Sequence, residues 1–271
     1  LKNAANRKKI GKEPKERLSA EGQIMGFADG LVAPTPWEKE QMIVHHRARP
    51  AKIKVIPCGV DLKLFKPIPP LRAKRFLGLS ERNFILFVGR IDAIKRIDVL
   101  IRAIHHLTCK PSDSHRDLGL IIIGGERDLD PQTQSQEMQG LRRMVAQMRL
   151  QDRVAFWGSQ RQDLLPYFYS AAEALVLPSR YESFGMVALE AMACGTPVIA
   201  SRVGGLQYTV EDGRTGFLIP EGDWRLLADR ICEVVENPPL RERLVAAAKE
   251  KVKQFGWPRI TKKVLSLYDS L

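Results

Sequence analysis

The 271-residue sequence has few cysteines, and none of them forms a paired motif. Its four cysteines, at positions 58, 109, 194 and 232, show no CxxC spacing. This spacing favours a reducing, cytoplasmic setting, and the length, which is enough to bury a core, excludes a small disulfide or zinc scaffold. No apolar run approaches the roughly 20 residues of a membrane-spanning helix. The five histidines lack companion ligands at the usual metal spacing, so no metal site is predicted.

Acidic residues are also scarce relative to basic ones, 31 against 43, which gives a formal net charge of +12 at pH 7. Such an excess favours anionic partners, whether nucleic acid, acidic lipid or phosphorylated small molecules. Between residues 2 and 17 basic side chains outnumber acidic ones seven to two, which we interpret as a solvated face or a frayed terminus. The length suits one large or two modest domains.

From residue 84 onward, short β-branched runs alternate with longer amphipathic stretches, which predicts an α/β fold with a doubly wound parallel sheet. The predicted strands are residues 84–88, 118–123, 154–157, 174–177, 198–201 and 216–219. The helices predicted with both ends are residues 96–107, 136–148, 164–171, 184–193 and 224–236. Two more helices are predicted to follow, one that starts at residues 237–239 and one that starts at the Trp257-Pro258 step.

The residues before about position 71 follow another pattern. A helix near 20–27, a strand at 31–33, a helix after Pro36 and a strand at 53–56 are too little to close a sheet. We therefore expect residues 1–56 to be the end of a preceding domain, and the proline-rich residues 57–70 to be a linker. The main domain would then cover residues 71–256, and residues 257–271 would form a last helix.

The most informative motif begins at Glu182, where Glu-Ser-Phe-Gly follows a strand and leads into an apolar helix. In a doubly wound sheet, ligands bind outside the carboxyl ends of the strands, where a helix N-terminus attracts anions. Gly185 would let the backbone approach such an anion closely. Glu190, two turns into the helix, can accept two hydrogen bonds from the vicinal hydroxyls of a ribose.

A second motif, Gly89-Arg90 with Lys95, leaves the first strand of the main domain. An arginine fork and a compact lysine charge together suit a diphosphate and can stabilise its departure. Further glycine turns follow other strands at positions 124–125 and 204–205, and residues 211–216 form a tight turn before the last predicted strand. The turn at 124–125 lacks the GxGxxG spacing of a dinucleotide site, so NAD binding has little support.

Together these motifs resemble those of the family 4 retaining glycosyltransferases of the GT-B fold, in which two Rossmann-like domains face each other across a cleft. The likeness covers nearly the whole chain, and its core is the Glu-x7-Glu element, here Glu182 and Glu190. Residues 182–197 are most similar to inositol-phosphate N-acetylglucosaminyltransferases, with sucrose-phosphate synthases as further relatives. The motifs occur in family order at residues 55–61 with Phe65, 89–95, 124–125, 181–197, 204–205 and 212–216.

The resemblance implies that Arg90 and Lys95 hold a donor diphosphate, that Glu190 binds the ribose hydroxyls and that Glu182 touches the donor sugar. Arg90, Lys95 and Glu182 are thus the candidate catalytic residues. A UDP-sugar is the expected donor, with GDP- and ADP-sugars as alternatives, and neither cofactor nor metal is implied. The candidate donor-binding residues are Gly89, Arg90, Lys95, Gln160, Glu182, Ser183, Phe184, Gly185, Met186 and Glu190.

The implied reaction moves a hexose to an acceptor hydroxyl on a sugar, a sugar phosphate, an inositol phosphate or a lipid-linked molecule. Most of the family's N-terminal, acceptor-binding domain has no counterpart here. We therefore expect the donor-binding half of a longer enzyme, inactive alone, whose last helix crosses back to the preceding domain with an uncovered apolar face.

Arg96 stands where many relatives have glycine, and it would add a bulky cation beside the phosphate site. A basic nucleic-acid-binding module is a second, less favoured hypothesis, and peripheral attachment to an acidic membrane is a third.

Overall fold

The computed structural model describes residues 15–79, 82–109, 118–125 and 135–271. The chain folds as two compact units. Unit 1 comprises the described residues up to Gly59 together with Phe255–Leu271, and unit 2 comprises Val60–Gln254. None of the helices in these ranges has the length and apolar character needed to cross a membrane.

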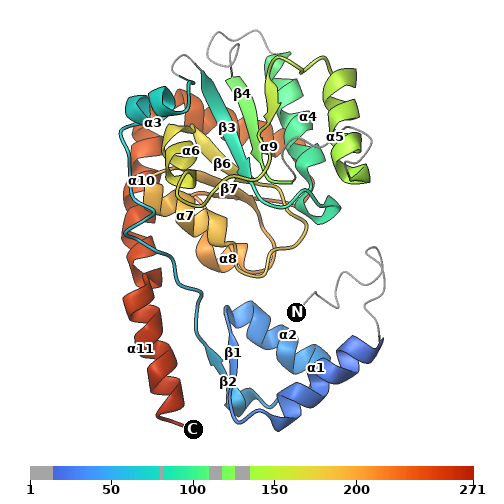
Figure 1. The fold of residues 1–271 in the computed structure, drawn as a ribbon, viewed down its shortest axis with the longest axis vertical. Coiled ribbons are helices and arrows are strands. Elements are labelled where there is room, and N and C mark those ends of the chain that lie inside the picture. The colour runs from blue at the N-terminus through green and yellow to red at the C-terminus, as the bar shows by residue number, and fades with distance from the viewer. Residues whose placement is uncertain (1–14, 80–81, 110–117, 126–134) are drawn as a thin grey trace. The chain divides into compact units, whose positions relative to one another are not determined.

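Unit 2 is built on a six-stranded parallel sheet (Figure 1). The strands lie in the order β5-β4-β3-β6-β7-β8, so the direction of winding reverses between β3 and β6. The predicted doubly wound α/β fold is confirmed. The strands are β3 (Asn83–Val88), β4 (Leu118–Ile123), β5 (Val154–Phe156), β6 (Ala174–Leu177), β7 (Val198–Ser201) and β8 (Phe217–Ile219).

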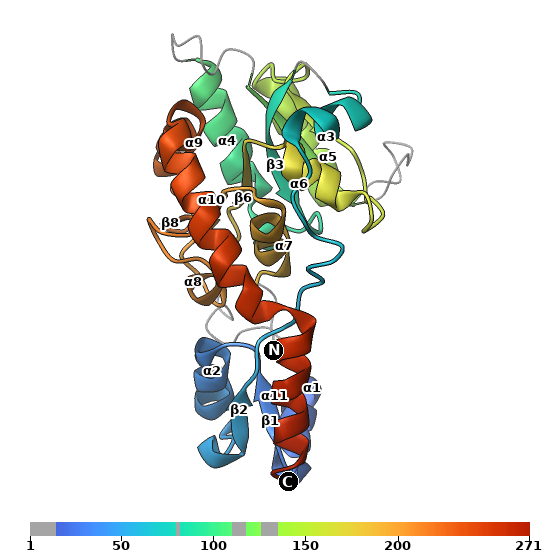
Figure 2. The ribbon, with the colours of Figure 1, turned by 90° about the vertical axis from the view of Figure 1, so that its left-hand side faces the viewer.

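Helices cover both faces of this sheet, which explains why its strands are apolar throughout. On one face α4 packs between α5 and α9, and on the other α6 packs between α3 and α7. In β3, Ile85 and Phe87 join the cluster under α4, while Phe84 and Leu86 alternate with them and are also buried. Figure 2 shows α10 beside α7 and α9.

The helix bounds agree with the sequence prediction to within two residues for the five helices predicted with both ends in this domain. Two short helices, α3 and α8, were not predicted. The helices of unit 2 are α3 (Pro70–Phe76), α4 (Ile97–Thr108), α5 (Gln136–Gln147), α6 (Leu165–Ala171), α7 (Met186–Cys194), α8 (Leu206–Thr209), α9 (Trp224–Glu236) and α10 (Pro238–Val252).

The segment predicted to be a linker, residues 57–70, is packed on unit 2 from Val60 onward. The Phe65 ring lies edge-on to Tyr169, with 6.1 Å between the ring centroids. The amide of Ile68 donates to the Ser170 hydroxyl at 3.1 Å. Prolines indicate that a segment is irregular, but they do not say whether its intervening side chains are buried.

Unit 1 contains a two-stranded parallel sheet of β1 (Leu31–Ala33) and β2 (Ile53–Val55). Its helices are α1 (Lys15–Phe27), α2 (Pro36–His46) and α11 (Trp257–Tyr268). The α2 helix begins with Thr35, whose hydroxyl accepts from the amide of Glu38 at 3.1 Å.

Helix α11 keeps most of its apolar side chains exposed within unit 1. Ile260 is buried, whereas Trp257, Leu265 and Tyr268 are 54%, 55% and 68% exposed. The end of the helix approaches the residues before β1, because the Leu267 and Leu271 side chains lie within 4 Å of the position that a Cβ on Gly30 would occupy.

Candidate functional site

The reversal of winding places two loops beside each other at the carboxyl edge of the sheet in unit 2. The loop after β3 carries Gly89, Arg90 and Lys95, and the loop after β6 carries Glu182 to Gly185. β3 and β6 are hydrogen-bonded neighbours, with Ile85 opposite Ala174. This is the position at which open α/β sheets bind ligands.

Lys95 and Glu182 meet across this edge. The Nζ atom of Lys95 donates to Oε2 of Glu182, and both side chains are only 16% exposed. Lys95 ends a 3-10 helix (Ala93–Lys95) whose first turn is capped by Asp92, which accepts from the amide of Ile94 at 3.0 Å. The structure thus brings together one predicted cation and one predicted carboxylate that are 87 residues apart.

Arg90 is in the same loop but does not join this pair. Its side chain is exposed and forms no hydrogen bond or ion pair with the residues that the structure describes. Gly89, before it, is anchored by its amide, which donates to the carbonyl of Ile123 at 3.0 Å. Arg90 is therefore a cation available to a ligand at the sheet edge, and no hydrogen bond or ion pair to a described residue fixes its side chain.

The Glu182 loop is held by close backbone contact with the loop after β7. The amide of Gly205 donates to the carbonyl of Glu182 at 2.8 Å. A Cβ on Gly205 would lie 2.0 Å from the carbonyl oxygen of Ser183, so only glycine fits there. The glycine pair after β7, seen in the sequence only as a turn, therefore supports the Glu182 loop.

Gly185 ends this loop in the left-handed conformation, with φ +86°. Helix α7 consequently begins at Met186, two residues later than predicted, and Phe184 lies outside the helix as a buried side chain. The candidate residues Ser183, Phe184, Gly185 and Met186 thus form the last turn of the loop and the first helical position. Amides at such a helix start are suited to an anion.

Two buried hydroxyl groups stand at the same sheet edge. Ser179, in the Glu182 loop, and Ser201, at the end of β7, are both fully buried, and neither hydroxyl has a hydrogen-bond partner among the described residues. An unpaired buried hydroxyl costs free energy, so each such group needs an explanation, and a role in a functional site is one.

Glu190 lies within α7 and faces another partner. Its Oε2 accepts from the hydroxyl of Tyr169 in α6 at 2.7 Å, and the side chain is buried. Burial raises the pKa of Glu190, and the hydrogen bond from Tyr169 opposes that rise. Within the described part of the chain, no hydrogen bond or ion pair joins Glu190 to Lys95 or Glu182.

Tyr169 was not identified from the sequence. It belongs to the apolar pattern of residues 165–171, in which a tyrosine is indistinguishable from any other core aromatic residue. The only available signal is that a buried tyrosine hydroxyl needs a partner.

Gln160 lies in the loop after β5 and is turned toward its own backbone. Its Nε2 donates to the carbonyl of Trp157 at 2.7 Å. The loops after β4 and β5 are joined by two backbone bonds: Gly124 donates to Gly158 at 2.9 Å, and Ser159 donates to Gly125 at 2.9 Å. Gln160 therefore belongs to a segment that is hydrogen-bonded to residues 124–125, and no hydrogen bond within the described ranges joins it to Lys95 or Glu182.

Arg96 does not direct its charge at the phosphate site, contrary to the expectation from the sequence. Its guanidinium bonds Asp98 at 2.9 and 3.1 Å and Glu221 at 3.3 Å. Glu221 also bonds Arg180 at 2.7 Å. Arg96 has φ +50°, a left-handed conformation that glycine adopts without strain. Its ion pairs therefore hold a turn that glycine would form without strain.

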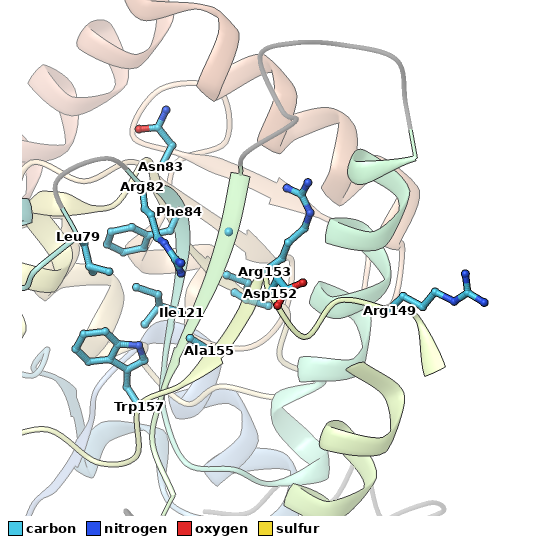
Figure 3. Close-up of a pocket in the computed structure, with 12 residues that line it drawn as sticks. Leu79, Arg82, Asn83, Phe84, Ile121, Arg149, Asp152, Arg153, Ala155 and Trp157 are labelled. Carbon is cyan, nitrogen blue, oxygen red and sulfur yellow. The ribbon is translucent and has the colours of Figure 1, made fainter. Parts of the chain in front are cut away.

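A cavity of about 510 Å³ lies elsewhere in unit 2 (Figure 3). Phe84, Ile121 and Trp157 line it with apolar surface, and Arg82 and Arg153 add positive charge. None of the candidate donor-binding residues lines this cavity. The described ranges also contain no group of three or more histidine, cysteine or acidic side chains that could hold a metal ion.

Comparisons with known proteins show what this chain is similar to. Residues 72–251 match the family described as Glycosyl transferases group 1, and residues 6–64 match Glycosyltransferase Family 4. The D-inositol 3-phosphate glycosyltransferase of Actinosynnema mirum is 39% identical over 272 residues, which cover 99% of this chain and 64% of that protein. The chain thus spans somewhat less than two thirds of the length of this relative.

Solved structures show the same similarity. A sucrose-phosphate synthase from Thermosynechococcus elongatus is 36% identical with a TM-score of 0.84, over 95% of this chain and 62% of that one. Anabaena HepE, determined in complex with UDP-glucose, is 26% identical with a TM-score of 0.82, over 94% of this chain and 68% of that one.

Proposed function

The chain belongs to the group 1 glycosyl transferases, and on that premise we propose that it carries the donor-binding half of a retaining hexosyltransferase. The donor is a nucleotide-diphosphate sugar, and the acceptor supplies a hydroxyl group. The observation that carries the proposal is the Lys95–Glu182 pair at the reversal point of the sheet. A charged pair at this edge suits a ligand that bears both a diphosphate and hydroxyl groups.

In this proposal each candidate residue binds one part of the donor. Lys95 and Arg90 neutralise the diphosphate, which makes a metal ion unnecessary for that purpose. Glu182, already bonded to Lys95, accepts from a hydroxyl of the sugar. The backbone at residues 184–186 meets the distal phosphate or the sugar, Glu190 binds the ribose, and Gln160 with its loop lies against the base.

The proposed reaction retains the configuration at the anomeric carbon. The bond between that carbon and the diphosphate oxygen breaks, the acceptor oxygen bonds to the same face, and the departing phosphate oxygen takes the acceptor proton. No protein nucleophile is required. The positive charge of Lys95 and Arg90 lowers the barrier by stabilising the negative charge that develops on the leaving diphosphate.

Uracil is the proposed base because a structural neighbour, HepE, has been determined with UDP and with UDP-glucose. An inositol phosphate is the first acceptor to test because the relative of Actinosynnema mirum acts on D-inositol 3-phosphate. Sugars, sugar phosphates and lipid-linked acceptors are the alternatives. We expect the 271-residue chain alone to bind donor without transferring sugar, since the described residues of unit 1 provide only a two-stranded sheet.

A thermal-shift screen of the 271-residue chain with UDP, GDP, ADP and their sugar conjugates tests this proposal. A ligand that binds the native state raises Tm by mass action. We expect UDP and a UDP-sugar to raise Tm at submillimolar concentration. Failure of all three nucleoside diphosphates to change Tm would contradict the proposal.

The net charge of +12 favours one competing function, a basic nucleic-acid-binding module. That function requires binding to generic duplex DNA or RNA that weakens steeply with salt. The donor-binding function requires preference for the mononucleotide diphosphate over an oligonucleotide. We propose a cytoplasmic location, with peripheral membrane contact only if the acceptor is lipid-linked, and co-sedimentation with anionic liposomes tests that contact.

A further inference from the structure

A buried polar pair joins helices α6 and α7. The hydroxyl of Tyr169 donates to Oε2 of Glu190 at 2.7 Å. Tyr169 is fully buried and Glu190 is 8% exposed. The tyrosine is fixed from two sides: its backbone carbonyl accepts from the Thr196 hydroxyl at 2.6 Å, and its ring packs edge-on against Phe65. The hydroxyl therefore has one position, and that position sets where the carboxylate lies.

The two oxygens of the Glu190 carboxylate differ. Oε2 accepts the hydrogen bond from Tyr169. Oε1 has no hydrogen-bond partner among the described residues, yet it is not one of the unpartnered atoms that are fully buried. Solvent therefore reaches Oε1. The carboxylate is thus anchored through one oxygen and open at the other. An anchored carboxylate with an open oxygen is preorganised to accept hydrogen bonds from a ligand.

The surroundings of Glu190 are costly for a charged group. No lysine or arginine in the described part of the chain forms an ion pair with it, and burial raises its pKa. The other titratable groups that face Glu190 are the Tyr169 hydroxyl and the Cys194 thiol. The pKa of Cys194 is raised to about 12, so this thiol is neutral. The hydrogen bond from Tyr169 is the contact that favours the ionised form of Glu190.

We propose that Tyr169 is a positioning residue for nucleotide recognition, which fixes one oxygen of Glu190 so that the other accepts from the ribose hydroxyls. The inference rests on the proposed function, in which Glu190 binds the ribose. Tyr169 then determines the preference for a ribonucleotide over a 2′-deoxyribonucleotide without touching the ligand.

The test measures this preference by calorimetry as the ratio of the Kd values for 2′-deoxy-UDP and UDP. Hydrogen bonds to a charged group are worth about 1.5–3 kcal/mol, so we expect the wild-type chain to prefer UDP by about tenfold or more. Tyr169→Phe keeps the ring and removes the hydroxyl, and it should reduce the preference to about threefold or less. Tyr167→Phe, in the same helix with its ring stacked on Phe76, is the matched control and should keep the full preference.

A pH series separates positioning from packing. The diphosphate is the same in both ligands, so its own titration cancels in the ratio. Because the hydrogen bond from Tyr169 lowers the pKa of Glu190, its removal raises that pKa. As the pH falls, the Tyr169→Phe chain should therefore lose its preference for UDP at a higher pH than the wild-type chain does. If Tyr169 only filled space, Tyr169→Phe would change Tm without moving the pH at which half of the preference is lost.

The outcomes distinguish the two proposals. A wild-type chain that binds no UDP, GDP or ADP overturns the proposed function, and this inference with it. A wild-type chain that binds UDP but shows no preference over 2′-deoxy-UDP, or one whose preference survives Tyr169→Phe, overturns this inference alone.

If Tyr169→Phe does not fold, Glu190→Gln tests the pair by changing its carboxylate partner instead. It should lose the preference and its pH dependence, and an unchanged preference would overturn the inference. When both variants fold, Tyr169→Phe should add nothing in the Glu190→Gln background, because the tyrosine acts through the carboxylate.

Discussion

A Cβ atom on Gly204 would lie 2.2 Å from the carbonyl oxygen of Glu182. The loops after β6 and β7 therefore touch through their main chains at the residue that contacts Lys95. Such an approach is closed to any residue with a side chain, and Gly204 also has φ +45°. The position of the Glu182 carboxylate thus depends on a glycine that has no chemistry of its own.

Gly204→Ala should destabilise the chain by about 2–4 kcal/mol, because the methyl group collides with backbone rather than with a movable side chain. Gly213→Ala is the matched control, since Gly213 has φ +72° and open space around its Cβ position. It should cost only the backbone strain, about 1–2 kcal/mol. Urea unfolding measures the free energy of unfolding of both variants. Equal losses in the two would show that the contact between Gly204 and the Glu182 carbonyl leaves room for a methyl group.

Lys95→Ala should weaken UDP binding by about tenfold or more, because it removes a charge-assisted contact to phosphate. It should also lower Tm, because it leaves the largely buried Glu182 carboxylate without its partner. Arg90→Ala should also weaken UDP binding but leave Tm unchanged, since the exposed Arg90 side chain forms no hydrogen bond or ion pair with the described residues. Arg102→Ala, on the exposed side of α4, is the control for net charge and should bind UDP normally. Unchanged affinity in Lys95→Ala and Arg90→Ala would remove both residues from the site.

Arg96→Gly and Arg96→Ala should differ in stability although both remove the same ion pairs. The pairs with Asp98 and Glu221 are partly exposed and together contribute about 1 kcal/mol or less. Glycine also relieves the left-handed strain, whereas alanine retains it. We expect the glycine variant to be more stable than the alanine variant by about 1 kcal/mol in urea unfolding. The reverse order would mean that the turn is not strained.

Glu190→Gln should stabilise the free chain at neutral pH while it weakens nucleotide binding. Burial raises the folded-state pKa of Glu190 above its unfolded value, so the wild-type chain loses stability as pH rises between those two values. Below the unfolded pKa the carboxyl is protonated in both states, and the two chains should have equal Tm. A variant less stable than the wild type at pH 7 would contradict the assigned direction of the shift.

Much of the fold could be predicted from the sequence because the strands of unit 2 are buried on both faces. Runs such as residues 118–123 are apolar without interruption, and their alternation with amphipathic stretches admits few topologies. The boundaries were less certain where glycine governs them. Gly185, in the left-handed conformation, delays the start of α7 to Met186.

The site was predicted in part. Glu182 and Lys95 carry recognisable motifs, and strands that are neighbours in the sheet bring the two loops together. Arg96 was misjudged because its sequence position says nothing about the direction of its side chain, which Asp98 and Glu221 decide. The packing of residues 60–70 was missed for a similar reason, because Phe65 finds its contact at Tyr169, far along the chain.

The sequence by itself determined the order of strands and helices and the set of charged residues at strand ends, because hydrophobic periodicity and turn residues are local properties. Only the tertiary structure decided which of those residues meet. The Tyr169–Glu190 bond joins two helices, and the fit of Gly204 against Glu182 joins two loops. Both depend on how elements pack across a sheet, where distances of a few tenths of an ångström matter and no local pattern records them.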